Sequence, residues 1–233
     1  MRTTGWQHRA LLVVSLLCVT TIFLTSGCDP CPKCVKPTIK PTPTPTATPT
    51  PSMALVAGGG NASAEIYASA TRTFSCVGGL APGGGCASVM SASRVNQTAT
   101  LLNSGAVLIA GGFDVTNGSF LSSADLFVSP SAGFTPVTAA MTMARAFDAA
   151  TLLSAGGGEV LIAGGFDTLT TELATAELYN PATESFARTG VMSEPRADFT
   201  LTTLPDGTAL AAGGAMGVTG ALDTAEIYNP ATG

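Results

Sequence analysis

Short apolar runs that end in a pair of glycines recur along this chain. The letters VLIAGG occupy residues 107–112 and again 160–165, and ALAAGG occupies residues 209–214. Each apolar run is short, β-prone or small in side chain and bounded by glycine, which predicts a strand. A Thr-rich segment and a Gly-containing turn precede each run, so we expect an antiparallel hairpin. Residues 55–60, LVAGGG, are an earlier copy of the same element.

The paired glycines are expected to adopt backbone conformations, and to allow close backbone approach, that a side chain would forbid. These positions are Gly111, Gly112, Gly164, Gly165, Gly213 and Gly214.

A third strand follows each glycine pair, with the order alanine, acid, branched aliphatic residue, aromatic residue. It reads AEIY at 64–67, ADLF at 124–127, AELY at 176–179 and AEIY at 225–228. A second aromatic residue stands seven positions later, at Phe74, Phe134 and Phe186, and is expected to lie in a fourth strand. We interpret the tyrosines of this motif, Tyr67, Tyr179 and Tyr228, as packing residues. No helical periodicity follows the N-terminal segment, so the predicted fold class is all-β.

Three arginines mark the repeat. Arg94, Arg145 and Arg196 lie 51 residues apart, and Met90, Met141 and Met192 keep the same spacing. A residue repeated in every unit is expected to serve the repeat. We therefore interpret the recurrent acids as structural partners of the arginines, through a charge pair or a backbone hydrogen bond. These acids are Glu65, Asp125, Glu177 and Glu226.

Four short antiparallel strands in a unit of about fifty residues are typical of one blade of a β-propeller. The motif set resembles the kelch repeat, as found in the propeller of galactose oxidase. The matching elements are the Gly-Gly pair, the acidic third strand with its Asn-Pro turn, the aromatic residue of the fourth strand and the arginine of the next unit. The resemblance covers residues 53–233, and it differs in carrying Phe where kelch units usually carry Trp.

The phase of the repeat predicts units of three, four, four and three strands. No first strand precedes residues 53–57, and the sequence stops at YNPATG, in the turn after a third strand. Kelch propellers usually contain five to seven blades. We therefore expect an incomplete, open propeller of about four blades, truncated at the C-terminus. A closed four-bladed ring is the alternative.

The N-terminus is expected to direct export and membrane anchoring. Arg2 and Arg9 precede an apolar run at residues 11–24, which suits the core of a signal peptide. Small residues then lead to Cys28, and this arrangement resembles the bacterial lipobox. The resemblance implies a signal peptide over residues 1–27 and lipidation of Cys28 in a bacterial cell envelope. An ordinary secretory signal is the alternative.

Residues 28–52 are rich in Cys, Pro and Thr and are expected to form an extended, disordered stalk. Cys28, Cys31 and Cys34 have the spacing C-x2-C-x2-C, but no fourth metal ligand is nearby. We favour pairing of Cys31 with Cys34, or free thiols, over a metal site.

Charge and composition exclude several function classes. The formal net charge is −5, and residues 53–233 hold only five scattered basic side chains, so we expect no nucleic-acid partner. The only histidine, His8, lies in the predicted signal. Copper oxidase chemistry of the galactose oxidase type needs His and Tyr ligands, so we expect no such site, no other metal and no cofactor.

Two further groups of residues are candidates for chemistry. Asp114 and Asp167 follow Gly-Gly-Phe, and we favour solvated loop acids there over ligand or Ca²⁺ contacts. Cys76 and Cys86 bound a Gly-rich insertion in the first unit, and we predict a disulfide between them, as expected for an exported domain.

The sequence therefore predicts no catalytic residue. It favours a non-catalytic, membrane-anchored module whose propeller loops bind a protein or a glycan. The alternative is a fragment of a secreted carbohydrate-active or oxidase-like enzyme whose catalytic residues lie outside this segment.

Overall fold

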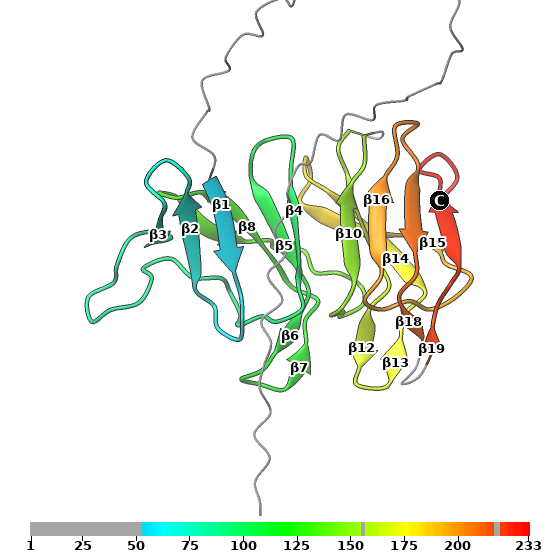
Figure 1. Cartoon of the computed structure of the whole chain (residues 1–233), viewed down its shortest axis with the longest axis horizontal. Helices are drawn as coiled ribbons and strands as arrows, with labels where there is room; N and C mark the ends of the chain where they lie inside the picture. The colour runs from blue at the N-terminus through cyan, green and yellow to red at the C-terminus, as the bar shows by residue number, and fades with distance from the viewer. Residues whose placement is uncertain (1–52, 155–156, 217–219) are drawn as a thin grey trace, which may run out of the picture. The chain divides into compact units, whose positions relative to one another are not determined.

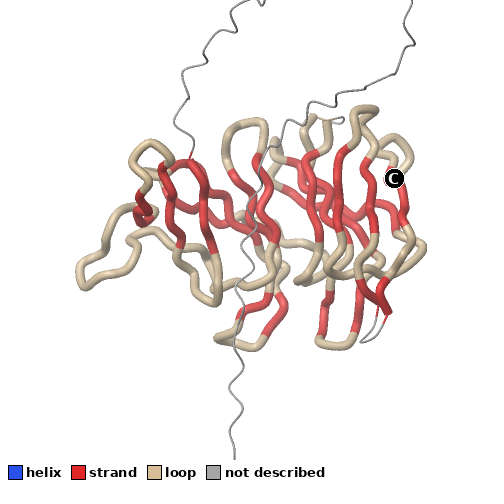
Figure 2. The backbone as a smooth tube through the Cα atoms, viewed as in Figure 1, coloured by secondary structure: helices blue, strands red, loops and turns tan. Residues whose placement is uncertain are grey.

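The computed structural model of the chain describes residues 53–154, 157–216 and 220–233, and every regular element in them is a strand (Figures 1 and 2). The predicted signal segment, the lipidation site Cys28 and the stalk to residue 52 lie outside the described residues. The described residues belong to one compact unit of the chain.

Four antiparallel sheets of three, four, four and three strands follow one another along the chain. The first sheet contains β1 (Met53–Ala57), β2 (Ala64–Ala68) and β3 (Thr73–Cys76). The second contains β4 (Thr98–Leu101), β5 (Val107–Ala110), β8 (Ala124–Ser129) and β9 (Gly133–Pro136). The third contains β10 (Ala149–Leu152), β11 (Val160–Ala163), β14 (Thr175–Asn180) and β15 (Ser185–Val191). The fourth contains β16 (Thr200–Thr203), β17 (Ala209–Ala212) and β20 (Ala225–Tyr228).

Three small hairpins leave the second, third and fourth sheets at the same point, between the second and third strands of the repeat. They are β6 (Phe113–Asp114) with β7 (Ser119–Phe120), β12 (Phe166–Thr168) with β13 (Thr171–Glu172), and β18 (Ala215–Met216) with β19 (Gly220–Ala221). All three project from the same end of the sheets, at the bottom of Figure 1. The sequence pattern predicts loops here, because strands of two or three residues carry no readable period.

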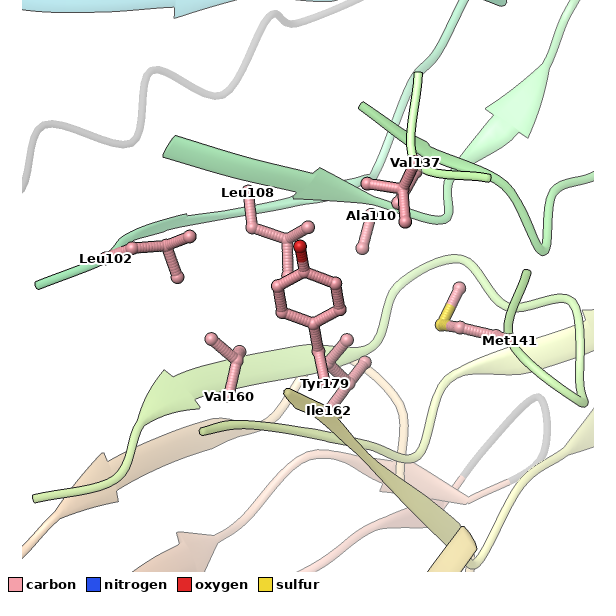
Figure 3. Close-up of a cluster of buried hydrophobic side chains, with 9 residues drawn as sticks. Leu102, Leu108, Ala110, Val137, Met141, Val160, Ile162 and Tyr179 are labelled. Carbon is pink, nitrogen blue, oxygen red and sulfur yellow. The ribbon is translucent and has the colours of Figure 1, made fainter. Parts of the chain in front are cut away.

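Apolar side chains form a layer between each sheet and the next. The strand β11 explains how, because its four residues are all buried and alternate between two layers. Val160 and Ile162 pack toward the second sheet, around the ring of Tyr179 (Figure 3), while Leu161 and Ala163 pack toward the fourth. A strand that is covered on both faces needs a continuous apolar run, and VLIA supplies it.

The first and fourth sheets have only one packed face in the described structure. In β17, Ala209 and Ala211 are buried against the third sheet, whereas Leu210 and Ala212 are only partly buried. In β1, Met53 and Val56 are 63% and 41% exposed. The described sheets therefore do not close on themselves. The fold is all-β, with separate antiparallel sheets packed in chain order, and is compatible with a propeller-like arrangement.

At Gly111 and Gly164, the first glycine of the pair lies against the backbone of the next arginine. Gly111 has a φ of +66°, and a Cβ atom built on it would lie 2.5 Å from the backbone oxygen of Arg145. The equivalent Gly213 has a φ of +67°, but its nearest such contact, with the Leu222 oxygen, is 3.7 Å. Glycine thus serves two needs at Gly111, the left-handed backbone and the close approach of the next sheet, and only the first at Gly213.

We expect Gly111→Ala to lower the free energy of unfolding by about 3 kcal/mol and Gly213→Ala by about 1 kcal/mol. The two substitutions share the backbone strain, so the difference measures the steric contact between sheets. Urea unfolding followed by circular dichroism checks both values. Equal losses would show that the contact with the Arg145 backbone contributes nothing.

Candidate functional site

A polar network in the second, third and fourth repeats is built around the recurrent arginine. The side chain of Arg94 is fully buried, and one of its nitrogens, Nη1, donates to the backbone oxygens of Gly111 (2.7 Å) and Ser123 (2.9 Å). The other, Nη2, donates to Asp125 Oδ2 at 2.8 Å and to Ser123 Oγ at 2.9 Å. The fork of the guanidinium thus joins the end of β5 to the start of β8.

The same arrangement recurs twice. Arg145 binds the oxygens of Gly164 and Thr175 and pairs with Glu177 Oε1 at 3.0 Å. Arg196 binds the oxygens of Gly213 and Thr224 and pairs with Glu226 Oε1, also at 3.0 Å. Both partners are fully buried in the first two pairs, whereas the Glu226 side chain is 23% exposed.

The carboxylates also hold the chain segment that leads to each arginine. Asp125 Oδ1 accepts the Ser91 backbone N–H at 3.0 Å, and Glu177 Oε2 accepts that of Thr142 at 2.7 Å. Glu226 Oε2 accepts the Ser193 N–H. Burial acts to raise the pKa of Glu226, but the hydrogen bonds from Ser193 and Arg196 outweigh it and hold the pKa below its usual value. Each carboxylate therefore satisfies a charge and a backbone donor together.

The arginine backbone joins consecutive sheets. The Gly112 N–H donates to the Arg145 oxygen at 2.8 Å, and the Arg145 N–H donates to the Leu121 oxygen at 3.1 Å. The third sheet repeats this link, since the Gly165 N–H donates to the Arg196 oxygen at 2.8 Å. Arg145 thus fixes its own sheet through its side chain and the preceding sheet through its backbone.

A second chain of hydrogen bonds runs between residues two positions after each arginine. Phe147 N–H donates to the Asn96 oxygen and Asp198 N–H to the Phe147 oxygen, both at 3.0 Å. All three residues have φ between +50° and +60°, a region that Asn and Asp tolerate and that Phe rarely adopts. The strained conformation is held by these bonds between neighbouring sheets.

Glu65 differs from the other recurrent acids. Its side chain is exposed, and within the described residues no arginine reaches it. The interpretation that all four acids are bound by the recurrent arginines is therefore wrong for Glu65.

The remaining predicted positions lie as follows. Tyr179 is fully buried, and burial raises its pKa to about 12. Tyr67 and Tyr228 are partly buried, and the Tyr228 hydroxyl lies 2.8 Å from Thr189 Oγ1. Tyr67 and Tyr179 each pack at 5.0 Å between ring centroids on the aromatic residue of the next strand. Cys76 and Cys86 form a disulfide that closes the insertion after β3.

The hairpin acids are not the solvated groups that the sequence suggested. Asp114 is 5% exposed, and its carboxylate accepts hydrogen bonds from Ser93 Oγ (2.7 Å), Asn117 Nδ2 (2.6 Å) and the Thr116 N–H (2.8 Å). These bonds lower the pKa of Asp114 to about 2. Asp167, at the same place in the next hairpin, is partly buried, and its Oδ1 has no partner among the described residues.

Asp148 is a buried acid whose environment the sequence did not reveal. Both of its carboxyl oxygens are buried and have no hydrogen-bond partner in the described structure. Burial raises its pKa to about 7, against a lowering effect of Arg145. Asp148 is the third residue after Arg145, and the equivalent residue after Arg94 is Gln97. Gln97 Nε2 donates to the Ala57 oxygen of the preceding sheet at 2.9 Å. An ionised acid at this position has no proton to donate in the same way.

Two hollows in the described structure lie below the usual volume of a pocket for a drug-sized ligand. One, of about 80 Å³, lies between the third and fourth sheets and is lined by Met192, Leu201 and Tyr228. The other, of about 280 Å³, lies beside Leu102 and Tyr179. Pockets that enclose ligands usually measure about 300–1,000 Å³.

Within the described ranges, no three His, Cys, Asp or Glu side chains come together as a metal site would require. The same ranges contain no helix long and apolar enough to cross a membrane. No family model matches the chain, and no curated protein matches it. The function is therefore inferred from the geometry of the repeats.

We expect Glu177→Gln to lower the free energy of unfolding by about 3–5 kcal/mol, because it leaves the charge of Arg145 buried without its partner. Glu226→Gln is the matched control, and we expect a loss of about 1–2 kcal/mol because that pair is partly exposed. Chemical denaturation at pH 7 measures both. A larger loss for Glu226→Gln would contradict the dependence on burial.

We expect Asp148→Asn to stabilise the protein by about 1–3 kcal/mol at pH 8 and to change little at pH 4. The pKa of Asp148 is higher in the folded state than in the unfolded chain. Its contribution to stability is therefore complete below about pH 4 and is lost as the pH rises to about 7. Thermal unfolding between pH 4 and pH 8 measures this, with the more exposed Asp198→Asn as control. A pH dependence that Asp148→Asn leaves unchanged would contradict the assignment.

Proposed function

We propose that this chain is a non-catalytic, membrane-anchored module of the bacterial cell envelope that binds a protein or a glycan outside the cytoplasm. In this proposal the repeats are kelch-like blades of an incomplete, open propeller. A lipid on Cys28 and the Pro/Thr stalk hold the blades away from the membrane surface. No nucleic-acid partner is proposed, because the net charge is negative and the three recurrent arginines are engaged within the repeats.

The observation that carries this proposal is the difference between the repeated framework and the three hairpins. The framework keeps its arginine, acid and glycines in every unit from the second to the fourth. The hairpins leave the same end of the sheets, but their sequences differ. Variable segments on a constant scaffold are typical of binding surfaces.

Each hairpin also exposes a large apolar side chain. Val115 is 50% exposed, Leu169 81% and Met216 44%. Isolated exposed apolar residues are common on proteins, but here one lies in each of three hairpins that leave the same end of the sheets, which suits a partner surface. In the chain, Thr116 follows Val115, and Thr168 and Thr170 flank Leu169; hydroxyl groups of this kind suit hydrogen bonding to a protein or a glycan.

The function is tested with the full-length lipoprotein in detergent, applied to a glycan array and to envelope extracts. We expect a ligand whose binding falls at least tenfold in the triple variant Val115→Asp, Leu169→Asp, Met216→Asp. Leu80→Asp is the control, because Leu80 is 77% exposed but lies in the disulfide loop of the first unit. Equal loss in both variants, or retention in the triple variant, would contradict binding through the hairpins.

The anchor is tested separately by metabolic labelling with a radioactive fatty acid in a bacterial host. We expect the wild-type chain to incorporate the label and to sediment with membranes. Cys28→Ala removes the thiol that would carry the lipid, so it is expected to lose both properties. Labelled, membrane-bound Cys28→Ala protein would show that the anchor lies elsewhere.

A further inference from the structure

The first sheet carries the acceptors that bind an arginine in the other three sheets. In the second sheet these acceptors are the Gly111 oxygen, the Ser123 oxygen and hydroxyl, and the carboxylate of Asp125. The third sheet uses Gly164, Thr175 and Glu177, and the fourth uses Gly213, Thr224 and Glu226. Both serine and threonine supply a hydroxyl at the middle position.

The register of β1 and β2 places Gly58, Ser63 and Glu65 at the same three positions. Ala57 pairs with Ala64 in the first sheet, as Ala110 pairs with Ala124 in the second. Gly58 and Ser63 directly flank the first of these pairs, and Gly111 and Ser123 flank the other. The hydrogen bond that closes the turn is also shared. Gly58 N–H donates to the Ser63 oxygen at 3.5 Å, and Gly111 N–H donates to the Ser123 oxygen at 3.1 Å.

The strand that accompanies the arginine in the other sheets has no counterpart in the first. In the second, third and fourth sheets, β4, β10 and β16 each begin four residues after the arginine and pair with the second strand of the repeat. The strand β1 corresponds to that second strand, and among the described residues it pairs only with β2. On its other edge the Ala57 oxygen accepts from Gln97 Nε2, and no described strand pairs with the rest of that edge. The side chain of Glu65, in the neighbouring strand β2, is exposed.

We propose that the edge of β1 binds an extended segment of another polypeptide, and that an arginine of this segment is held by Glu65 and the oxygens of Gly58 and Ser63. The segment adds to the first sheet as a strand, beginning about four residues after its arginine. Backbone hydrogen bonds to β1 supply affinity, and the arginine fixes the register.

Charge and pattern define the partner. A carboxylate with two backbone oxygens and a hydroxyl offers only acceptors to a cation, and the planar fork of arginine matches them better than lysine does. The three internal examples also share a polar residue three positions before the arginine: Ser91, Thr142 and Ser193. The backbone N–H of each donates to the recurrent acid. The partner motif is therefore Ser or Thr, two residues, Arg, three residues, then an alternating β-strand.

This inference concerns a different part of the molecule from the hairpins. Its site lies at the edge of β1, and it holds whether or not the hairpins bind a ligand.

The test uses the full-length chain in detergent and a fluorescent peptide with the sequence of residues 91–102, SASRVNQTATLL. We expect the peptide to bind, and its Arg94→Ala version to bind at least tenfold more weakly. The Arg94→Lys version is expected to fall between them. Hydrogen exchange of the complex is expected to show new protection at residues 53–57, which would mark strand addition.

The matched variant is Glu65→Gln, which is expected to weaken the wild-type peptide at least tenfold and to leave the melting temperature unchanged, because Glu65 is exposed. Glu184→Gln, at an exposed turn after β14, is expected to bind like the wild type. Absence of binding, or binding indifferent to Arg94→Ala and Glu65→Gln, would overturn the proposal. Analytical ultracentrifugation of the chain without peptide tests whether a second copy occupies the edge. If the wild type is a dimer and Glu65→Gln is a monomer, the edge of β1 binds another copy of this chain, and the proposed partner is overturned.

Discussion

The buried arginine of each repeat is the interaction on which the rest of the structure depends. Arg145 binds two backbone oxygens and a carboxylate of its own sheet through its side chain, while its backbone accepts from Gly112 of the sheet before. A buried guanidinium is costly unless its charge and donors find partners. Nη1 and Nη2 of Arg145 find them here, whereas its buried Nε has none among the described residues, so the acceptors of Nη1 and Nη2 must be in place for the unit to fold. Because one residue makes both sets of contacts, the folding of the third sheet is coupled to its packing against the second.

The position of a sheet in the series decides how much of it is buried. The central strand β11 has neighbours on both faces and is wholly apolar and buried, whereas β1 and β17 each have one packed face. The ion pairs follow the same trend. Asp125 and Glu177 lie in β8 and β14 and are fully buried, whereas Glu226 in β20 is partly exposed. Packing between repeats therefore sets the electrostatic environment of otherwise identical positions.

The repeats separate residues that maintain the scaffold from residues that are free to vary. Most of the recurrent polar groups are used in contacts within and between the sheets. The hairpins and the edge of β1 lie outside this framework. Asp148 lies inside the framework, but its carboxyl oxygens make no such contact in the described structure. At the equivalent position of the second repeat, the uncharged amide of Gln97 donates a hydrogen bond to the preceding sheet.

The sequence by itself determined the period, the strand count of each sheet and the residues that recur, because glycine pairs, alternating strands and 51-residue spacing are local signals. It also indicated that the acids pair with the arginines, since residues that repeat together are expected to interact. Only the tertiary structure decided that Glu65 stands apart, that Asp114 is held by Ser93 and that Asp148 is buried without a partner. These properties depend on which sheet lies alongside each residue, and no local pattern in the chain records that.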